Sequence, residues 1–263
     1  MLKRVLLIGG IVAALILAVV GYTVFRTPEA ASGPIQAIPI APTGAASGAA
    51  PTVASDAAPT SAASGAAPTA ASDAAPTGGA AAAAPQIFEI VPTESEARFL
   101  IDEVLRGSPV TVVGTTNQVA GQIAIDPSNP ASAQVGTIQV NARTIVTDND
   151  FRNRAIKNAI LQTDQYEFVT FKPTSISGLP ASVAANTPFT FQMIGDLTVR
   201  DVTKPVTFDV TVTPISATEL KGSAKTSLLY RDLGLNIPDS PSVDTVADEV
   251  RLELDFIARP SAG

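Results

Sequence analysis

The stretch GDLTVRDVTKPVTFDVTVT, residues 195–213, decides the fold of this chain. Together with the residues just before it, it predicts two long strands that reverse direction at Arg200-Asp201. Apolar and polar side chains alternate on both sides of that turn, so each strand has one apolar face and one hydrated face. The first strand, Phe189–Val199, would be roughly 36 Å long at about 3.3 Å per residue. Strands this long and amphipathic indicate a tall, closed sheet with an apolar interior.

β-branched residues and period-two alternation extend over residues 86–263, which predict one folded domain of ordinary size. Further strands are expected on both sides of the long pair, from Ile87–Val91 to Glu249–Ala258, and a β-bulge is expected at Gly136. We estimate about eight strands with short links. The sequence therefore predicts a mainly β fold, an extended antiparallel up-and-down barrel of a size that can enclose one small ligand.

One substantial α-helix is expected in this domain, at Thr147–Leu161. Thr147 or Asp148 can cap its N-terminus, and acidic residues in the first turn are favourable there. Its apolar residues recur at helical spacing and should form one stripe that faces the sheet. The stripe consists of Phe151, Ala155, Ile156, Ala159 and Ile160.

An uncharged apolar run, Val5–Phe25, follows the basic residues Lys3 and Arg4. As a helix it would be about 31 Å long, which matches the hydrocarbon core of a bilayer. The sequence therefore predicts a cytoplasmic tip and a single transmembrane signal-anchor helix in residues 1–26, and a cleaved signal peptide is the alternative. The basic residues favour a cytoplasmic N-terminus, which places the predicted barrel on the outer side of the cell membrane.

Residues 27–85 are rich in Ala, Pro, Ser and Thr and contain a repeat with a spacing of 17 residues. AASGAAPT occurs at residues 45–52 and again at residues 62–69. Such a segment has too few large apolar side chains to offset the entropy of ordering, so it predicts a disordered linker. The linker would serve as a stalk between membrane and barrel, or only as a passive connection.

The composition narrows the chemistry available to the chain. It has neither cysteine nor histidine, so it lacks the commonest metal ligand and the commonest general base. The formal net charge of −7 argues against a nucleic acid as partner. We expect no cofactor and no metal site, and we leave a homo-oligomer open.

The apolar faces of the predicted strands are the candidate binding site for a long-chain lipid. The alternative is a solid core filled by the same side chains. Arg200 and Lys204, at one end of the barrel, are candidates for contacts with a lipid headgroup. The residues expected to line the barrel are Phe189, Phe191, Met193, Leu197, Val199, Phe208, Val210, Leu252, Leu254 and Phe256.

Two functions of other classes compete with lipid binding. Asp148 and Asp150, near Arg152 and Arg154, could serve a hydrolase, although helix capping and surface ion pairing explain them more simply. A stalked surface domain that binds another protein and holds no ligand would share the anchor and the linker. A barrel interior packed solid would favour that second alternative.

Several motifs resemble those of the YceI-like family of bacterial extracytoplasmic proteins. The run GDLTVRDVTKPV at residues 195–206 is similar to the family's VTKPV signature, residues 147–153 to its helix start, and YEFVTF at residues 166–171 to one of its strands. The resemblance covers residues 87–260 and implies a lipocalin-like barrel that carries an isoprenoid or a similar long-chain lipid without being an enzyme. The whole chain is then expected to be a membrane-anchored protein that stores, transports or senses this lipid.

Overall fold

The computed structural model describes Tyr22, residues 26–40 and residues 85–261. The predicted membrane segment apart from Tyr22, and residues 41–84 of the predicted linker, lie outside the described residues. Among the residues that are described, no helix is both long and apolar enough to cross a membrane.

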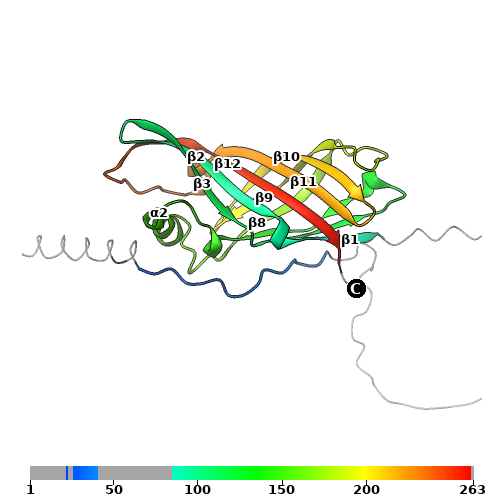
Figure 1. Ribbon diagram of the computed structural model, residues 1–263, viewed down its shortest axis with the longest axis horizontal. Coiled ribbons are helices and arrows are strands. Elements are labelled where there is room, and N and C mark those ends of the chain that lie inside the picture. The colour runs from blue at the N-terminus through cyan, green and yellow to red at the C-terminus, as the bar shows by residue number, and fades with distance from the viewer. Residues whose placement is uncertain (1–21, 23–25, 41–84, 262–263) are drawn as a thin grey trace, which may run out of the picture. The chain divides into compact units, whose positions relative to one another are not determined.

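The domain is an antiparallel sheet that curls strongly, with short helical segments in its connections (Figure 1). Its strands are β1 (Gln86–Ile90), β2 (Glu96–Leu105), β3 (Ser108–Thr116), β4 (Val119–Ala120), β5 (Gln122–Ile125), β6 (Gln134–Val135), β7 (Ile138–Asn141), β8 (Phe168–Ser177), β9 (Phe189–Val199), β10 (Val202–Ser216), β11 (Glu219–Leu229) and β12 (Val243–Pro260). Its helical segments are η1 (Pro92–Glu94), η2 (Pro130–Ser132), η3 (Ala142–Thr144), α2 (Asp150–Ala155), η4 (Ile156–Ile160) and η5 (Tyr230–Leu233).

The strand order is β4-β7-β8-β9-β10-β11-β12-β1-β5-β6, and β2 pairs with both β12 and β3. The long strand β12 pairs with β11 along one edge and with β2 and then β1 along the other. Only Gly121 separates β4, which pairs with β7, from β5, which pairs with β1. The sheet therefore curls so far that β1 and β7 pair with adjacent parts of one continuous segment, residues 119–125.

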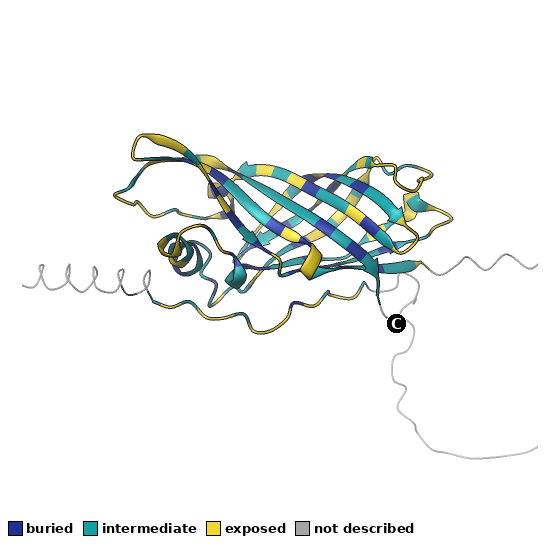
Figure 2. Ribbon diagram, in the orientation of Figure 1, coloured by how far each residue is buried: buried dark blue, intermediate teal, exposed yellow. Residues whose placement is uncertain are grey.

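The long hairpin is confirmed. Strands β9 and β10 pair in register from Val199 opposite Val202, so that Arg200 and Asp201 alone form the turn. Arg200 has a φ of 56°, in the left-handed region that non-glycine residues adopt mainly in turns. Buried and exposed residues alternate along these strands as predicted (Figure 2). The alternation leaves one face of each strand for the interior of the curled sheet.

Twelve strands are seen in the described residues where about eight were expected, because breaks divide several segments that the sequence presents as continuous. At Gly136 we expected a bulge, but the chain changes partners there: β6 pairs with β5, and β7 pairs with β4 and β8. The amide of Gly136 donates to the carbonyl of Gln122 at 2.8 Å. An added Cβ at Gly136 would lie 2.9 Å from a side-chain carbon of Ile40.

The predicted helix is shorter than expected and begins later. It starts at Asp150 as α2 and continues as the π-helical turn η4 to Ile160. The capping residue is Asn149, not Thr147 or Asp148, because the Asn149 side chain accepts from the amides of the first turn. The apolar stripe is also wrong at one position: Phe151 is 66% exposed, since the first turn projects away from the sheet.

Residues 26–40, which we call the strap, pack along the domain although they fall within the predicted linker. The strap is the blue segment that runs lengthwise below the sheet in Figure 1. Side chains of the segment 143–167 hold its first half. Among these contacts, the amide of Glu29 donates to Asp164 Oδ1 (2.9 Å) and Arg143 Nη1 donates to the carbonyl of Ala30 (3.1 Å). The amide and hydroxyl of Ser32 both donate to Glu167 Oε1 (2.8 and 3.0 Å).

The second half of the strap lies over the segment that joins β4 to β5. The amides of Ile35 and Ile40 donate to the side-chain oxygens of Gln118 (3.1 Å) and Gln122 (2.9 Å). Ile35 is 9% exposed and so behaves as a core residue. The strap thus covers the place where the sheet changes from one set of partners to the other.

Substitution of Gly195 by alanine should destabilise the fold by about 1–3 kcal/mol, the usual cost of overpacking. A methyl group at Gly195 would lie 2.8 Å from the backbone Cα of Pro173 and 2.7 Å from the ring of Phe171. Gly33→Ala is the matched control, because a Cβ there meets nothing within 4 Å. Urea unfolding of both variants measures the difference. Equal stabilities would contradict the close approach of β8 and β9.

Glu167 should make the stability of the domain pH-dependent. Burial acts to raise the pKa of Glu167, but the hydrogen bonds from Ser32 and Asn141 and the charge of Arg143 outweigh it and lower the pKa overall. A lowered folded-state pKa contributes stability above the ordinary glutamate value near 4.3, and this contribution is lost as the pH falls through the folded value.

Glu167→Gln should therefore cost about 1.5–3 kcal/mol at pH 7, the range of hydrogen bonds to a charged group. The difference from the natural chain should shrink as the pH falls from the ordinary glutamate value through the lower folded-state pKa, where the natural Glu167 becomes protonated as well. Denaturant unfolding over a pH series measures both. Glu249→Gln, at an exposed position, controls for the loss of one charge. A difference independent of pH would show that the strap does not depend on the Glu167 carboxylate.

Candidate functional site

Two apolar cavities lie inside the curled sheet, with volumes of about 280 and 260 Å³. Four residues line both cavities, namely Ile138, Met193, Ala224 and Leu254. The two cavities therefore adjoin at these four residues, which we call the constriction. Strands β8 to β12 contribute inward-facing apolar side chains over their length. These side chains surround the two cavities, so the interior of the domain is not completely filled.

All ten residues predicted to line the barrel lie on a cavity wall. Leu197, Val199, Phe208 and Leu252 line the first cavity, and Met193 and Leu254 line both. The second cavity is lined by Phe189, Phe191, Val210 and Phe256. The alternation in the sequence was sufficient to find these positions, because it marks which side chains point inward. That they bind a lipid stays a prediction.

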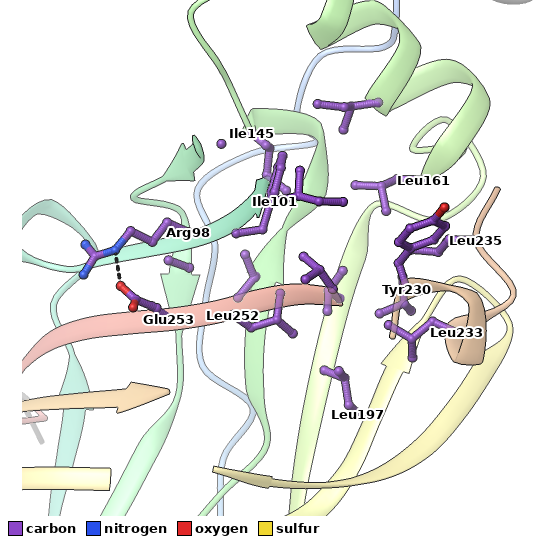
Figure 3. Close-up of a pocket in the computed structure, with 18 of the residues that line it drawn as sticks. Arg98, Ile101, Ile145, Leu161, Leu197, Tyr230, Leu233, Leu235, Leu252 and Glu253 are labelled. Carbon is purple, nitrogen blue, oxygen red and sulfur yellow. Dashed lines mark hydrogen bonds and ion pairs between the residues drawn. The ribbon is translucent and has the colours of Figure 1, made fainter. Parts of the chain in front are cut away.

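The first cavity is bounded by the helical segments at one end of the sheet. Ile156 and Ile160 of η4 line it, as do Tyr230 and Leu233 of η5. Figure 3 shows the apolar side chains of this cavity, Ile101, Leu161 and Leu197 among them, around a common space. The sequence identified the helix but not the contribution of η5, since a short turn of this kind leaves no periodic pattern.

The second cavity ends among loops at the other end of the sheet. Pro127 and Pro130 come from the loop after β5, and Leu179 and Val183 from the loop after β8. Apart from Gln86 and Ser216, the residues around this cavity are apolar. Nothing in its wall can compensate a buried charge, so it suits a hydrocarbon chain and excludes an ionic group.

One charged pair points into the first cavity. Arg152 Nη2 of α2 donates to Glu103 Oε1 of β2 at 2.8 Å, and Glu103 is only 8% exposed. Arg152 also pairs at 2.5 Å with Asp148, which lies just before the start of α2. The pair thus joins the helix to the sheet at the wall of the cavity. It can offer a hydrogen-bond donor to a polar ligand end only if the existing bonds are shared or exchanged.

Sequence reasoning did not find this pair. The signal for it was present, because Glu103 falls on the same strand phase as the apolar Phe99 and Ile101. A carboxylate on an inward phase requires a buried partner. Its partner, Arg152, is 49 residues away and could be identified only from the fold.

A second charged pair, Arg98 with Glu253, borders the first cavity from the side. Figure 3 shows this pair apart from the apolar side chains. Arg98 Nε donates to Glu253 at 2.7 Å, and Arg98 also contacts Asp255 and Glu96. The hydrogen bond from Arg98 lowers the pKa of Glu253. The contacts of Arg98 with Glu253 and Asp255 connect β2 to β12 and stabilise the wall of the cavity, which Arg98 and Glu253 both line.

The predicted headgroup contacts do not line either cavity. Arg200 Nη1 donates to the carbonyl of Ile160 at 3.2 Å and so binds the C-terminal end of η4 to the hairpin turn. Lys204 is exposed. Both residues nevertheless lie at the end of the sheet where the first cavity meets η4, because the β9–β10 turn contacts η4 there.

The acidic cluster at the helix start has the geometry of a cap. Asp148 pairs with Arg152 and is mostly exposed, and Asp150 lies exposed in the first turn of α2. Within the described residues there is no group of three or more acidic, His or Cys side chains that could hold a metal ion. The arrangement offers helix capping and a surface ion pair, and it does not bring two carboxylates to opposite sides of a cleft.

Solved structures show the same fold. A polyisoprenoid-binding domain from Saccharophagus degradans, implicated in plant cell wall breakdown, matches with a TM-score of 0.54 and 14% identity over 66% of this chain and 98% of that chain. BcnA of Burkholderia cenocepacia matches with a TM-score of 0.51 and 16% identity over 64% of this chain and 98% of that chain. No curated protein sequence matches the chain.

The model of the YceI-like domain matches residues 88–258, which are well over half of the chain. The match spans β1 to β12 and contains both cavities, the VTKPV run and the helix start on which the resemblance was based. The chain therefore belongs to the YceI-like family.

Proposed function

We propose that this chain binds one long-chain isoprenoid or a similar lipid inside the curled sheet and catalyses no reaction. The observation that carries the proposal is the pair of apolar cavities that meet at Ile138, Met193, Ala224 and Leu254. A chain threaded through both would occupy the length of the sheet. The related fold of a polyisoprenoid-binding domain supports the choice of ligand class.

We propose that the sheet forms a closed barrel of eight strand elements around the ligand. The strands reduce to eight elements if those that follow one another in sequence around a kink are counted together. These groups are β1 with β2, β3 with β4 and β5, and β6 with β7. The pairings of β5 with β1 and of β4 with β7 support the closure. Barrels of about eight strands have room for one small ligand.

The energetics of such binding need no catalytic or cationic residue. Burial of one methylene group contributes about 0.8 kcal/mol, so ten groups would contribute about 8 kcal/mol. That is a micromolar affinity before the costs of ordering are subtracted. The polar end of the ligand would lie at the Glu103–Arg152 pair, since the second cavity offers no charged group.

We further propose that residues 5–25 anchor the chain in the cell membrane with the domain on the outer side. The proposal is supported by the length of the apolar run and by the basic residues before it. A lipid-binding domain beside a bilayer could store, transport or sense its ligand. A solid interior would have favoured the surface-interaction alternative, and the two cavities weigh against it.

Blocking the constriction should shorten the ligand that the protein accepts. Delipidated full-length chain should bind isoprenoid alcohols of increasing length more and more tightly until both cavities are filled. Ala224→Phe adds a ring at the constriction and should abolish the gain beyond the length that fills one cavity. Titration followed by native mass spectrometry measures this.

Ser227→Phe is the matched control, because it adds the same ring at an exposed position of the same strand. It should keep the length dependence of the natural chain. No binding of any isoprenoid by the natural chain would contradict the proposed function. An unchanged length dependence in Ala224→Phe would contradict the threading of one chain through both cavities.

A further inference from the structure

The strap begins where the first cavity ends. Arg26 forms an ion pair with Asp164, and its carbonyl accepts a hydrogen bond from Asn158 Nδ2 at 2.7 Å. Asn158 belongs to η4, and Ile156 and Ile160 of the same segment line the first cavity. The start of the strap is therefore fixed to the outer side of the helix whose inner side contacts the cavity.

The amide of Arg26 donates to the carbonyl of Tyr22 at 3.0 Å, a bond of helical spacing. The apolar run that ends at Phe25 is thus followed directly by a residue bound to the domain. In the sequence no residue separates the end of that run from Arg26, which binds η4. A linker of some sixty residues would instead allow a separation of about 40 Å.

We propose that the strap holds the η4 end of the domain, with the end of the first cavity beside it, against the surface of the bilayer. This inference rests on the proposed membrane anchor and on the proposed lipid ligand. On this inference, residues 41–84 connect two segments of the domain. They do not separate the membrane from the cavity. The ligand then passes between bilayer and cavity without crossing a wide aqueous gap.

The surface at this end fits a bilayer interface. Phe151 is 66% exposed on the outer side of α2, and the guanidinium of Arg154 lies 5.9 Å from its ring centre. An exposed aromatic ring beside a cation is a typical contact with the interfacial region of a bilayer. Lys204 is exposed at the same end and can meet anionic headgroups.

The orientation can be measured by energy transfer to labelled lipid headgroups. The chain has no cysteine, so Asp150→Cys on α2 and Thr218→Cys in the β10–β11 turn each give one labelling site. The 15 residues of β10 separate the two ends of the sheet by about 50 Å. Full-length protein is placed in phosphatidylethanolamine–phosphatidylglycerol vesicles that carry an acceptor dye on the headgroup.

Energy transfer should be strong from the Asp150 site and close to background from the Thr218 site. Ile35→Asp should release the strap, because it places a charge at a position that is 9% exposed, and most of the transfer from the Asp150 site should be lost. Ile38→Asp is the matched control, since Ile38 lies in the same strap at 43% exposure, and it should leave transfer unchanged. Arg26→Gln with Glu29→Gln gives a second release variant, which removes the ion pairs of the strap with Asp164 and Arg143 and alters no residue of the sheet.

Equal transfer from both sites in the natural strap would overturn the orientation, as would strong transfer that persists in both release variants. Failure of the chain to sediment with vesicles would overturn the anchor and this inference together. Binding of isoprenoid alcohols by the delipidated chain is measured separately, so a failure of the lipid-binding proposal is distinguishable from a failure of the orientation.

Discussion

The alternation of apolar and polar side chains along β9, β10 and β12 is the constraint on which the rest of the structure depends. Because of this alternation, apolar residues occupy the inner face of a strongly curled sheet. The curl leaves a cavity between these apolar side chains. Contacts between side chains of the wall stabilise a sheet of this kind. Phe171 and Phe208, for example, meet edge to face with ring centres 4.8 Å apart. The interior then remains available for an apolar guest.

The same constraint explains why the polar contacts lie at the ends and on the outside. Glu103, the one carboxylate on an inward phase of β2, is buried and needs Arg152 from the helix to neutralise it. Other pairs, such as Arg98 with Glu253, join neighbouring strands at the wall of the cavity. The strap uses backbone amides against Gln118 and Gln122, at the place where the sheet changes partners.

The sequence predicted what local periodicity encodes and missed what depends on contacts distant in the chain. The β9–β10 register follows from period-two alternation and was confirmed. The same alternation led to the ten positions that lie on the cavity walls, and their role in binding a ligand stays a prediction. The strap was missed, since Ala, Pro, Ser and Gly around it resemble the linker; Ile35, Ile38 and Ile40 were the only local signal of packing. Arg200 was assigned to a headgroup because its partner, the carbonyl of Ile160, is apparent only in the fold.

A carrier of this design requires three things of its sequence: inward apolar strands, space between them, and a defined route for the guest. The first two are visible in the walls of the two cavities. The most direct measurement is lipid extraction and native mass spectrometry of the full-length chain purified from cells. The account predicts one tightly held long-chain lipid per chain. Recovery of the chain with no lipid, and with none taken up on incubation with membrane extract, would contradict it.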